Sequence, residues 1–175
     1  MNLKPQDIFV LLKLITLGNG EWSYAKLAVD LAMSPAEVHA AIKRTLRAKL
    51  TVQYNARIRA NTRNLSDFLL HGISYVFIPD RGEITKGLPT LSAAPPLLTE
   101  QLATEAPPPV WPDPKGDVRG QSFSPLYRSV PEAARNDNML YQLLVLTDGL
   151  RGGNTREQTA AAMEMEKRLD NYRRL

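Results

Sequence analysis

Seven basic residues and no acidic ones lie between Val38 and Ser66, and this cluster is the part of the sequence best suited to chemistry with a charged partner. The formal net charge is +4, so without these seven residues the remaining 146 carry −3. A local cationic patch on a slightly acidic chain indicates a phosphate-facing surface, and the alternative is a solvated basic face. The seven are Lys43, Arg44, Arg47, Lys49, Arg57, Arg59 and Arg63.

Catalytic and metal-binding patterns are weak by comparison. The chain has no cysteine, which excludes disulfides, thiolate metal sites and cysteine nucleophiles. His39 and His71 are 32 residues apart with no carboxylate at ligand spacing, and Asp113 and Asp117 stand in a Pro/Gly-rich loop as turn formers. Gly82 to Gly87 lacks the spacing of a phosphate loop. We therefore expect no enzyme, no metal and no cofactor.

The cationic residues need elements to position them, and the patterns before and among them predict three helices and a hairpin. Apolar residues at helical spacing predict a helix that begins at Pro5 and ends before Gly18, and a second over 24–32 with Ser23 as its N-cap. Ser34, Pro35 and Glu37 form a capping box that starts a third helix, 35–48. Residues 50–54 and 57–59 then predict a short β-hairpin.

The rest of the chain reads as a helix over 64–71, a strand over 73–78, a proline-rich stretch and further helices. Eight of the thirteen prolines lie between Leu88 and Pro114, which predicts an extended connector without regular structure, pinned to the protein by a buried Trp111. The expected fold is mainly α with a small β component. It has three parts: a winged-helix module over 1–87, a connector over 88–124 and a helical extension over 125–175.

The segment from Leu27 to Leu46, LAVDLAMSPAEVHAAIKRTL, resembles the helix-turn-helix of MarR-like bacterial transcriptional regulators. The resemblance covers about residues 5 to 65. It departs from the usual pattern at two places, because Ala32 and Lys49 stand where glycine is common. It implies a winged-helix fold that binds double-stranded DNA.

Helical periodicity divides the third helix into two faces. Val38, Ile42, Thr45 and Leu46 form a core stripe, and small residues followed by cations occupy the other side, as a helix in the major groove requires. Arg57, Arg59 and Arg63 extend the cationic surface, or one of them pairs with Asp67 or a C-terminal carboxylate. The expected DNA-contacting residues are Ser34, Ala36, His39, Ala40, Lys43, Arg44, Arg47, Arg57, Arg59 and Arg63.

The predicted function is a sequence-specific transcriptional regulator, a repressor, that reads double-stranded DNA with helix 35–48. The alternative is an antitoxin-type protein whose part from 125 onward neutralises a partner protein. Apolar stripes on helix one and over Leu140 to Leu150 predict a homodimer, unless the C-terminal helices fold back over helix one. No signal peptide or membrane span is evident, so we expect a cytoplasmic protein without a membrane partner.

Overall fold

Three helices and a hairpin open the chain, in the order predicted. The computed structural model describes residues 2–173, and in it α1 (Pro5–Leu17), α2 (Tyr24–Leu31) and α3 (Pro35–Arg47) precede β1 (Thr51–Tyr54) and β2 (Arg57–Ala60). The predicted capping box is confirmed: Glu37 donates its backbone N–H to Ser34 Oγ at 3.2 Å, and Ser34 donates its own to Glu37 Oε2 at 3.0 Å. Asn55 and Ala56 join the antiparallel strands with φ of 46° and 64°, as a type I′ turn requires.

Two further helices follow the hairpin, α4 (Thr62–His71) and α5 (Ile73–Val76). The strand predicted over 73–78 is wrong, because its first residues form the single turn of α5. Ile73 and Phe77 are buried four residues apart, and the Phe77 N–H donates to the Ile73 carbonyl at 2.9 Å. Helical spacing of the two buried side chains prevails here over the strand preference of β-branched residues.

The proline-rich segment is ordered, and the prediction of a connector without regular structure over 88–124 is wrong. It contains the end of β3 (Arg81–Pro89), the short 3₁₀ helix η1 (Leu91–Ala93), β4 (Pro109–Pro112) and β5 (Val118–Phe123). Strand β3 pairs antiparallel with both β4 and β5, and β4 is parallel to β5. Prolines stand at the ends of β3 and β4, where a missing N–H costs little, and Val110, Trp111 and Phe123 are buried.

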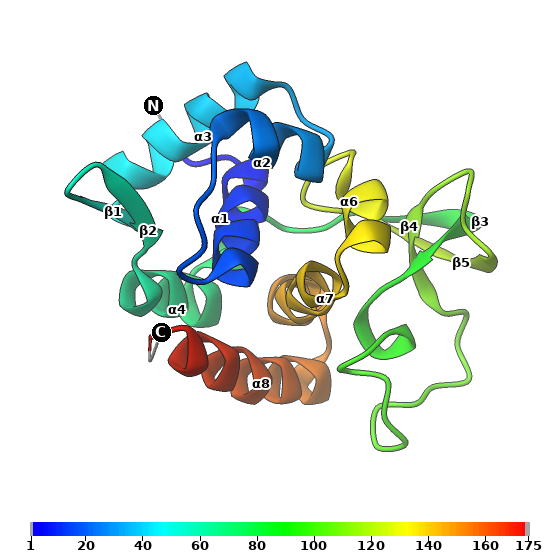
Figure 1. Cartoon of the computed structure of the whole chain (residues 1–175). Helices are drawn as coiled ribbons and strands as arrows, with labels where there is room; N and C mark the ends of the chain where they lie inside the picture. Colours follow the sequence, from blue (N-terminus) through cyan, green and yellow to red (C-terminus); the bar gives the residue numbers. More distant parts are fainter. Residues whose placement is uncertain (1, 174–175) are drawn as a thin grey trace.

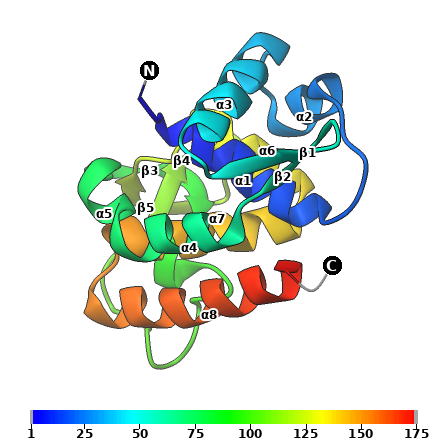
Figure 2. The ribbon, with the colours of Figure 1, turned by 90° about the vertical axis from the view of Figure 1, so that its left-hand side faces the viewer.

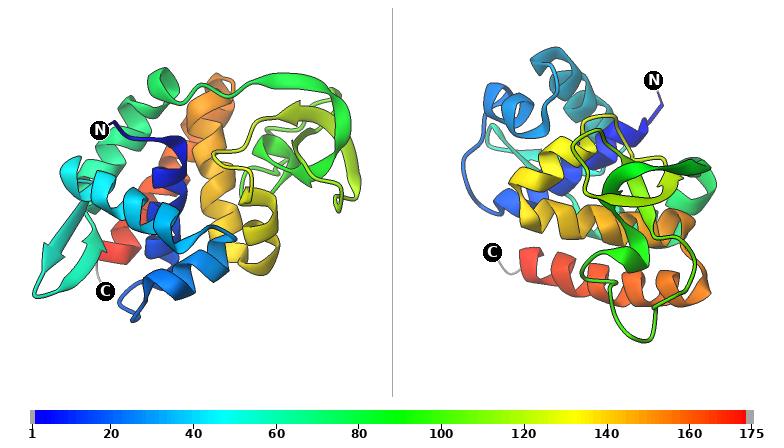
Figure 3. Two further views of the ribbon diagram at one scale, coloured as in Figure 1. Left: turned by 90° about the horizontal axis from the view of Figure 1, so that it is seen from above. Right: turned by 90° about the vertical axis from the view of Figure 1, so that its right-hand side faces the viewer.

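The C-terminal helices are α6 (Val130–Asn136), α7 (Asn138–Gly152) and α8 (Thr155–Arg173). Helix α7 runs through the middle of the molecule, between α1 on one side and α8 on the other, and every residue from Leu143 to Arg151 is buried. The hairpin and the β3–β5 strands lie at opposite ends of the protein (Figures 1 and 3). One hydrophobic core includes residues from Ile8 to Tyr172, so the helices after 125 pack into the same core as α1.

This packing removes the sequence-based reason for a homodimer. The apolar residues of α1 from Ile8 to Ile15 are all buried within the single chain, and α7 contacts α1 with its own apolar residues. The chain thus follows the alternative in which the C-terminal helices fold back across helix one. Both apolar stripes are covered without a second copy.

A buried carboxylate joins α7 to the strands. Asp148 Oδ2 accepts hydrogen bonds from Trp111 Nε1 and Thr90 Oγ1, both at 2.7 Å, and its Oδ1 accepts from Arg151 Nε at 2.8 Å. Burial raises the pKa of Asp148, and its three partners act in the opposite direction. Trp111 is 1% exposed, which confirms that it pins the segment to the rest of the protein.

No helix in the described part of the chain is long and apolar enough to cross a membrane.

The structure accommodates Ala32 and Lys49, the two residues that stand where glycine is common. Their φ values are 48° and 59°, so both residues adopt the left-handed conformation that glycine favours. The hydrogen bonds at the two helix ends are also alike: Met33 N donates to Ala28 O and Leu50 N to Thr45 O, each at 2.9 Å. The turn after α2 therefore forms with alanine in place of glycine.

Replacing Ala32 with glycine should stabilise the protein by about 1 kcal/mol, because a left-handed alanine carries a steric cost that glycine avoids. The measurement is urea unfolding followed by circular dichroism. Ala162→Gly in the interior of α8 is the matched control and should lose about 1 kcal/mol. If both glycine variants are destabilised alike, the conformation described for Ala32 is wrong.

Candidate nucleic-acid interface

One side of α3, the hairpin and the start of α4 form a cationic surface, which we call the α3–hairpin surface. On α3, residues 36, 40, 43 and 47 follow one another at helical spacing, and all are exposed except the half-buried Ala40. Ser34 and His39 are exposed beside them. The structure leaves nine of the ten predicted residues accessible, namely Ser34, Ala36, His39, Ala40, Lys43, Arg47, Arg57, Arg59 and Arg63.

Arg44 is the exception, and its prediction as a DNA-contacting residue is wrong. Its side chain is 9% exposed and binds Asp7 of α1 through Nε at 2.8 Å and Nη2 at 2.6 Å. Asp7 is fully buried, and a carboxylate there requires a cation. Arg44 lies at the edge of the exposed arc of α3, from which its long side chain reaches back to α1. An aspartate within the apolar pattern of helix one was the sequence signal for this pair.

The arginines of the hairpin and of α4, Arg57, Arg59 and Arg63, are exposed, and none of them pairs with Asp67 within the described residues. The Nη2 atom of Arg57 lies 3.9 Å from Glu21 Oε1, and the two side chains are 75% and 93% exposed. The guanidinium of Arg59 lies 5.6 Å from the centre of the Tyr172 ring. An exposed ion pair of this length contributes little, so these cations stay available to a stronger anion.

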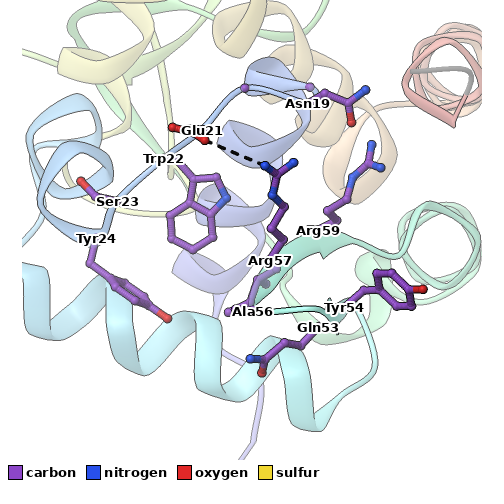
Figure 4. A pocket seen from close by; sticks show the side chains of 13 residues that line it. Asn19, Glu21, Trp22, Ser23, Tyr24, Gln53, Tyr54, Ala56, Arg57 and Arg59 are labelled. Atoms are coloured by element: carbon purple, nitrogen blue, oxygen red, sulfur yellow. Dashed lines mark ion pairs between the residues drawn. The ribbon is translucent and has the colours of Figure 1, made fainter.

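A recess of about 690 Å³ opens beside the α3–hairpin surface, between the loop 18–23 and the hairpin (Figure 4). Trp22 and Tyr24 form one wall, with their ring centres 5.4 Å apart and an interplanar angle of 86°. Tyr24 also contacts His39 of α3, at 5.0 Å between ring centres. This recess was not predicted from the sequence, because α2 and α3 separate the loop from the hairpin along the chain.

Residues from the C-terminal half hold the beginning of α3. The Tyr127 hydroxyl donates to Glu37 Oε1, and Ser129 Oγ donates to the carbonyl of Leu31 at 2.6 Å. Hydrogen bonds from Tyr127 and from Ser34 lower the pKa of Glu37 to about 2. Arg128 lies over the Tyr127 ring, 5.5 Å from its centre, and adds an exposed cation that the sequence analysis did not include.

A buried lysine provides a second connection between the two halves. Lys13 Nζ of α1 lies 2.8 Å from Asp137 Oδ2, at the start of α7, and 3.3 Å from Asp30 Oδ2 of α2. Burial opposes the charge of Lys13, but the hydrogen bonds and charges of Asp137 and Asp30 raise its pKa overall. Helices α1, α2 and α7 thus meet at one ammonium group.

The weak catalytic patterns do not assemble into a site in the described residues. The described residues contain no group of three or more His, Asp or Glu side chains that could bind a metal ion. Gly82 to Gly87 lies within β3. Asp113 accepts the backbone N–H of Lys115 at 3.0 Å, as a turn former does, and forms an ion pair with Arg135.

A second concave surface, which we call the α8 groove, lies where the loop after η1 meets α8 and has a volume of about 960 Å³. Apolar side chains line much of it, namely Leu97, Leu102, Ala160 and Met163. Met163 is 68% exposed, and the neighbouring Leu98 is 59% exposed.

Arg44→Ala should cost roughly 3–5 kcal/mol of stability, because it leaves the Asp7 carboxylate buried without its cation. Arg47→Ala, three residues further along α3 and exposed, should cost less than about 0.5 kcal/mol. Urea unfolding of both variants measures the difference. Asp7→Leu combined with Arg44→Leu should recover part of the loss. Equal, small losses in the two single variants would show that the pair does not hold α1 to α3.

Tyr127→Phe should raise the pKa of Glu37 from its value of about 2, because it removes the largest cause of the lowered pKa. The stabilisation that ionised Glu37 provides is present above the pKa of unfolded glutamate and is lost as the pH falls toward 2, so this acid loss should be shallower in the variant. Carboxyl-detected NMR titration gives the pKa directly. Tyr141→Phe, whose hydroxyl donates to Pro89 O, is the control and should leave Glu37 unchanged.

No protein-family model, curated protein or solved structure matches this chain. The α3–hairpin surface and the two concave surfaces are therefore the features from which a function is inferred.

Proposed function

We propose that the protein is a sequence-specific, double-stranded DNA-binding transcriptional regulator related in fold to MarR-like winged-helix proteins. Helix α3 enters the major groove and the β1–β2 hairpin lies against the backbone as the wing. The observation that supports this most is the run of exposed cations on α3, the hairpin and the start of α4. Lys43 and Arg47 continue into Arg57, Arg59 and Arg63, with no carboxylate in the segment from residue 38 to residue 66.

The order of residues along α3 supports base reading in addition to backbone binding. Ala36 and Ala40, near the beginning of the helix, have small side chains that permit close approach to the base edges. Lys43 and Arg47 follow one and two turns later, where they reach phosphates or guanine edges. A regulator of this kind acts as a repressor where its site overlaps a promoter.

Arg44 does not belong to the α3–hairpin surface, but its ion pair with Asp7 supports that surface. The Asp7–Arg44 pair attaches α3 to α1 through two hydrogen bonds, so the exposed face of α3 has a fixed orientation. The exposed cations are thereby held on a rigid element, which favours a surface that must fit a groove.

The change Arg47→Ala should weaken duplex binding and reduce the slope of log affinity against log salt concentration by about 1, because one phosphate contact releases about 0.9 counterions. Fluorescence anisotropy with duplex DNA, selected from a random pool by the full-length protein, measures both quantities at several salt concentrations. Lys167→Ala, an exposed lysine on α8, is the matched control and should change neither.

Ala40→Glu tests insertion of the helix into the groove in the same assay, because a carboxylate at this position meets the acceptor-rich base edges. Selected sequences should lose their advantage over random duplex. If the unmodified protein shows no salt-dependent duplex binding, the DNA-binding function is excluded.

We propose, as a second candidate, that the protein is of the antitoxin type and binds an amphipathic helix of a partner protein in the α8 groove. The exposed Met163 and the apolar Leu97, Leu102 and Ala160 that line this groove favour it, since apolar grooves of this kind bind the apolar face of a helix. Co-purification with the product of the adjacent reading frame should be lost in Met163→Lys and kept in Arg47→Ala. If co-purification is lost in both variants, or kept in both, the α8 groove is not the binding site of the partner. The full chain is required, because a fragment from Pro125 lacks the α1 side of the core.

A further inference from the structure

The recess between the loop 18–23 and the hairpin combines an aromatic wall with two guanidinium groups. Figure 4 shows Trp22 between Tyr24 and Arg57, and Arg59 further along the same strand as Arg57. Its volume of about 690 Å³ lies in the range of roughly 300–1,000 Å³ typical of small-ligand sites. A duplex is far too large for such a space.

The aromatic wall suits a planar ring. Trp22 is half-buried and is held by the edge of Tyr24, which in turn contacts His39. A tryptophan fixed in this way keeps a preformed stacking surface, and stacking accepts any heterocyclic base because every base has a π-face.

The cationic side suits a phosphate. Arg57 and Arg59 are two residues apart on β2, so their side chains project from the same face of the hairpin. The one ion pair that Arg57 makes within the described residues is with Glu21, at 3.9 Å and on the exposed surface. A phosphate accepts charge-assisted hydrogen bonds from a guanidinium in a forked arrangement and competes easily with so weak a partner.

We propose that this recess binds an unpaired nucleotide, with the base stacked on Trp22 and the phosphate held by Arg57 and Arg59. The Gln53 side chain lines the recess and offers an amide donor and acceptor to the edge of the base. The ligand is either a free nucleoside monophosphate or a nucleotide of a single strand, which share this chemistry. The site shares Arg57 and Arg59 with the proposed duplex-binding surface, but Trp22 lines only the recess and Arg47 belongs only to the duplex-binding surface. Trp22→Ala and Arg47→Ala therefore distinguish a failure of one property from a failure of the other.

Titration of the full-length protein with adenosine 5′-monophosphate tests the proposal. Stacking should quench tryptophan fluorescence in a saturable way at millimolar ligand or below. The chain has two tryptophans, and Trp111 is 1% exposed, so the quenching reports on Trp22. Adenosine and inorganic phosphate, each carrying half of the recognised chemistry, should bind at least tenfold more weakly.

Variants and a second probe separate the possible outcomes, measured by isothermal titration calorimetry. Arg57→Ala should weaken binding at least tenfold, Trp22→Phe should weaken it less than Trp22→Ala, and Arg63→Ala, outside the recess, should have no effect. Tighter binding of a tetradeoxyadenylate than of the monophosphate assigns the site to a single strand, and equal binding assigns it to the free nucleotide. Phosphate binding as tight as that of the nucleotide, an unchanged Arg57→Ala variant, or no saturable binding overturns the proposal. If Arg47→Ala loses duplex binding but keeps nucleotide binding, the proposal that the recess binds a nucleotide is supported.

Discussion

The buried carboxylate of Asp148 is the constraint on which the arrangement of the whole chain depends. A charge that is 2% exposed is tolerated only when its lone pairs are satisfied, and here Trp111, Thr90 and Arg151 satisfy them. Arg151 also donates to the carbonyls of Phe77 and Ser124. One short segment of α7 thus holds the chain before β3, the region around β4 and the chain after β5. With α7 fixed, Asp137 at its beginning meets Lys13 of α1, and α6 carries Ser129 to the end of α2. The orientation of the α3–hairpin surface is therefore set from the C-terminal half of the chain.

The elements that sequence reasoning predicted correctly are those whose signals are local. Ser34 and Glu37 satisfy each other's backbone groups within one turn, and the hairpin closes over two residues, so neither depends on distant packing. The same applies to the exposed cations of α3, which follow from helical periodicity once the start of the helix is known. Further helices were expected after residue 125, but the break between α6 and α7 was not, although Asp137 caps α7 through its side-chain oxygen.

The features that were not predicted depend on partners far away in the sequence. Arg44 pairs with Asp7, 37 residues earlier, and Tyr127 reaches Glu37 across 90 residues. Strand β4 exists because β3 and β5 offer edges to it, although its prolines argue against a strand locally. The recess needs the loop 18–23 and β2 to be neighbours. Composition and periodicity describe a residue and its near neighbours, so they cannot show which distant group will neutralise a buried charge or complete a sheet.

The burial of α1 under α7 has a consequence for synthesis on the ribosome. Lys13 and Asp137 are 124 residues apart, so the apolar face of α1 is made long before the helix that covers it. A nascent chain that ends after α4 already contains the complete cationic surface, yet it exposes the apolar residues of α1 that α7 covers in the finished protein. Contacts between such distant segments also slow folding, because a long loop must close before they contribute. Newly made chains therefore pass through an aggregation-prone stage. A holding chaperone or rapid completion of translation would protect them at that stage.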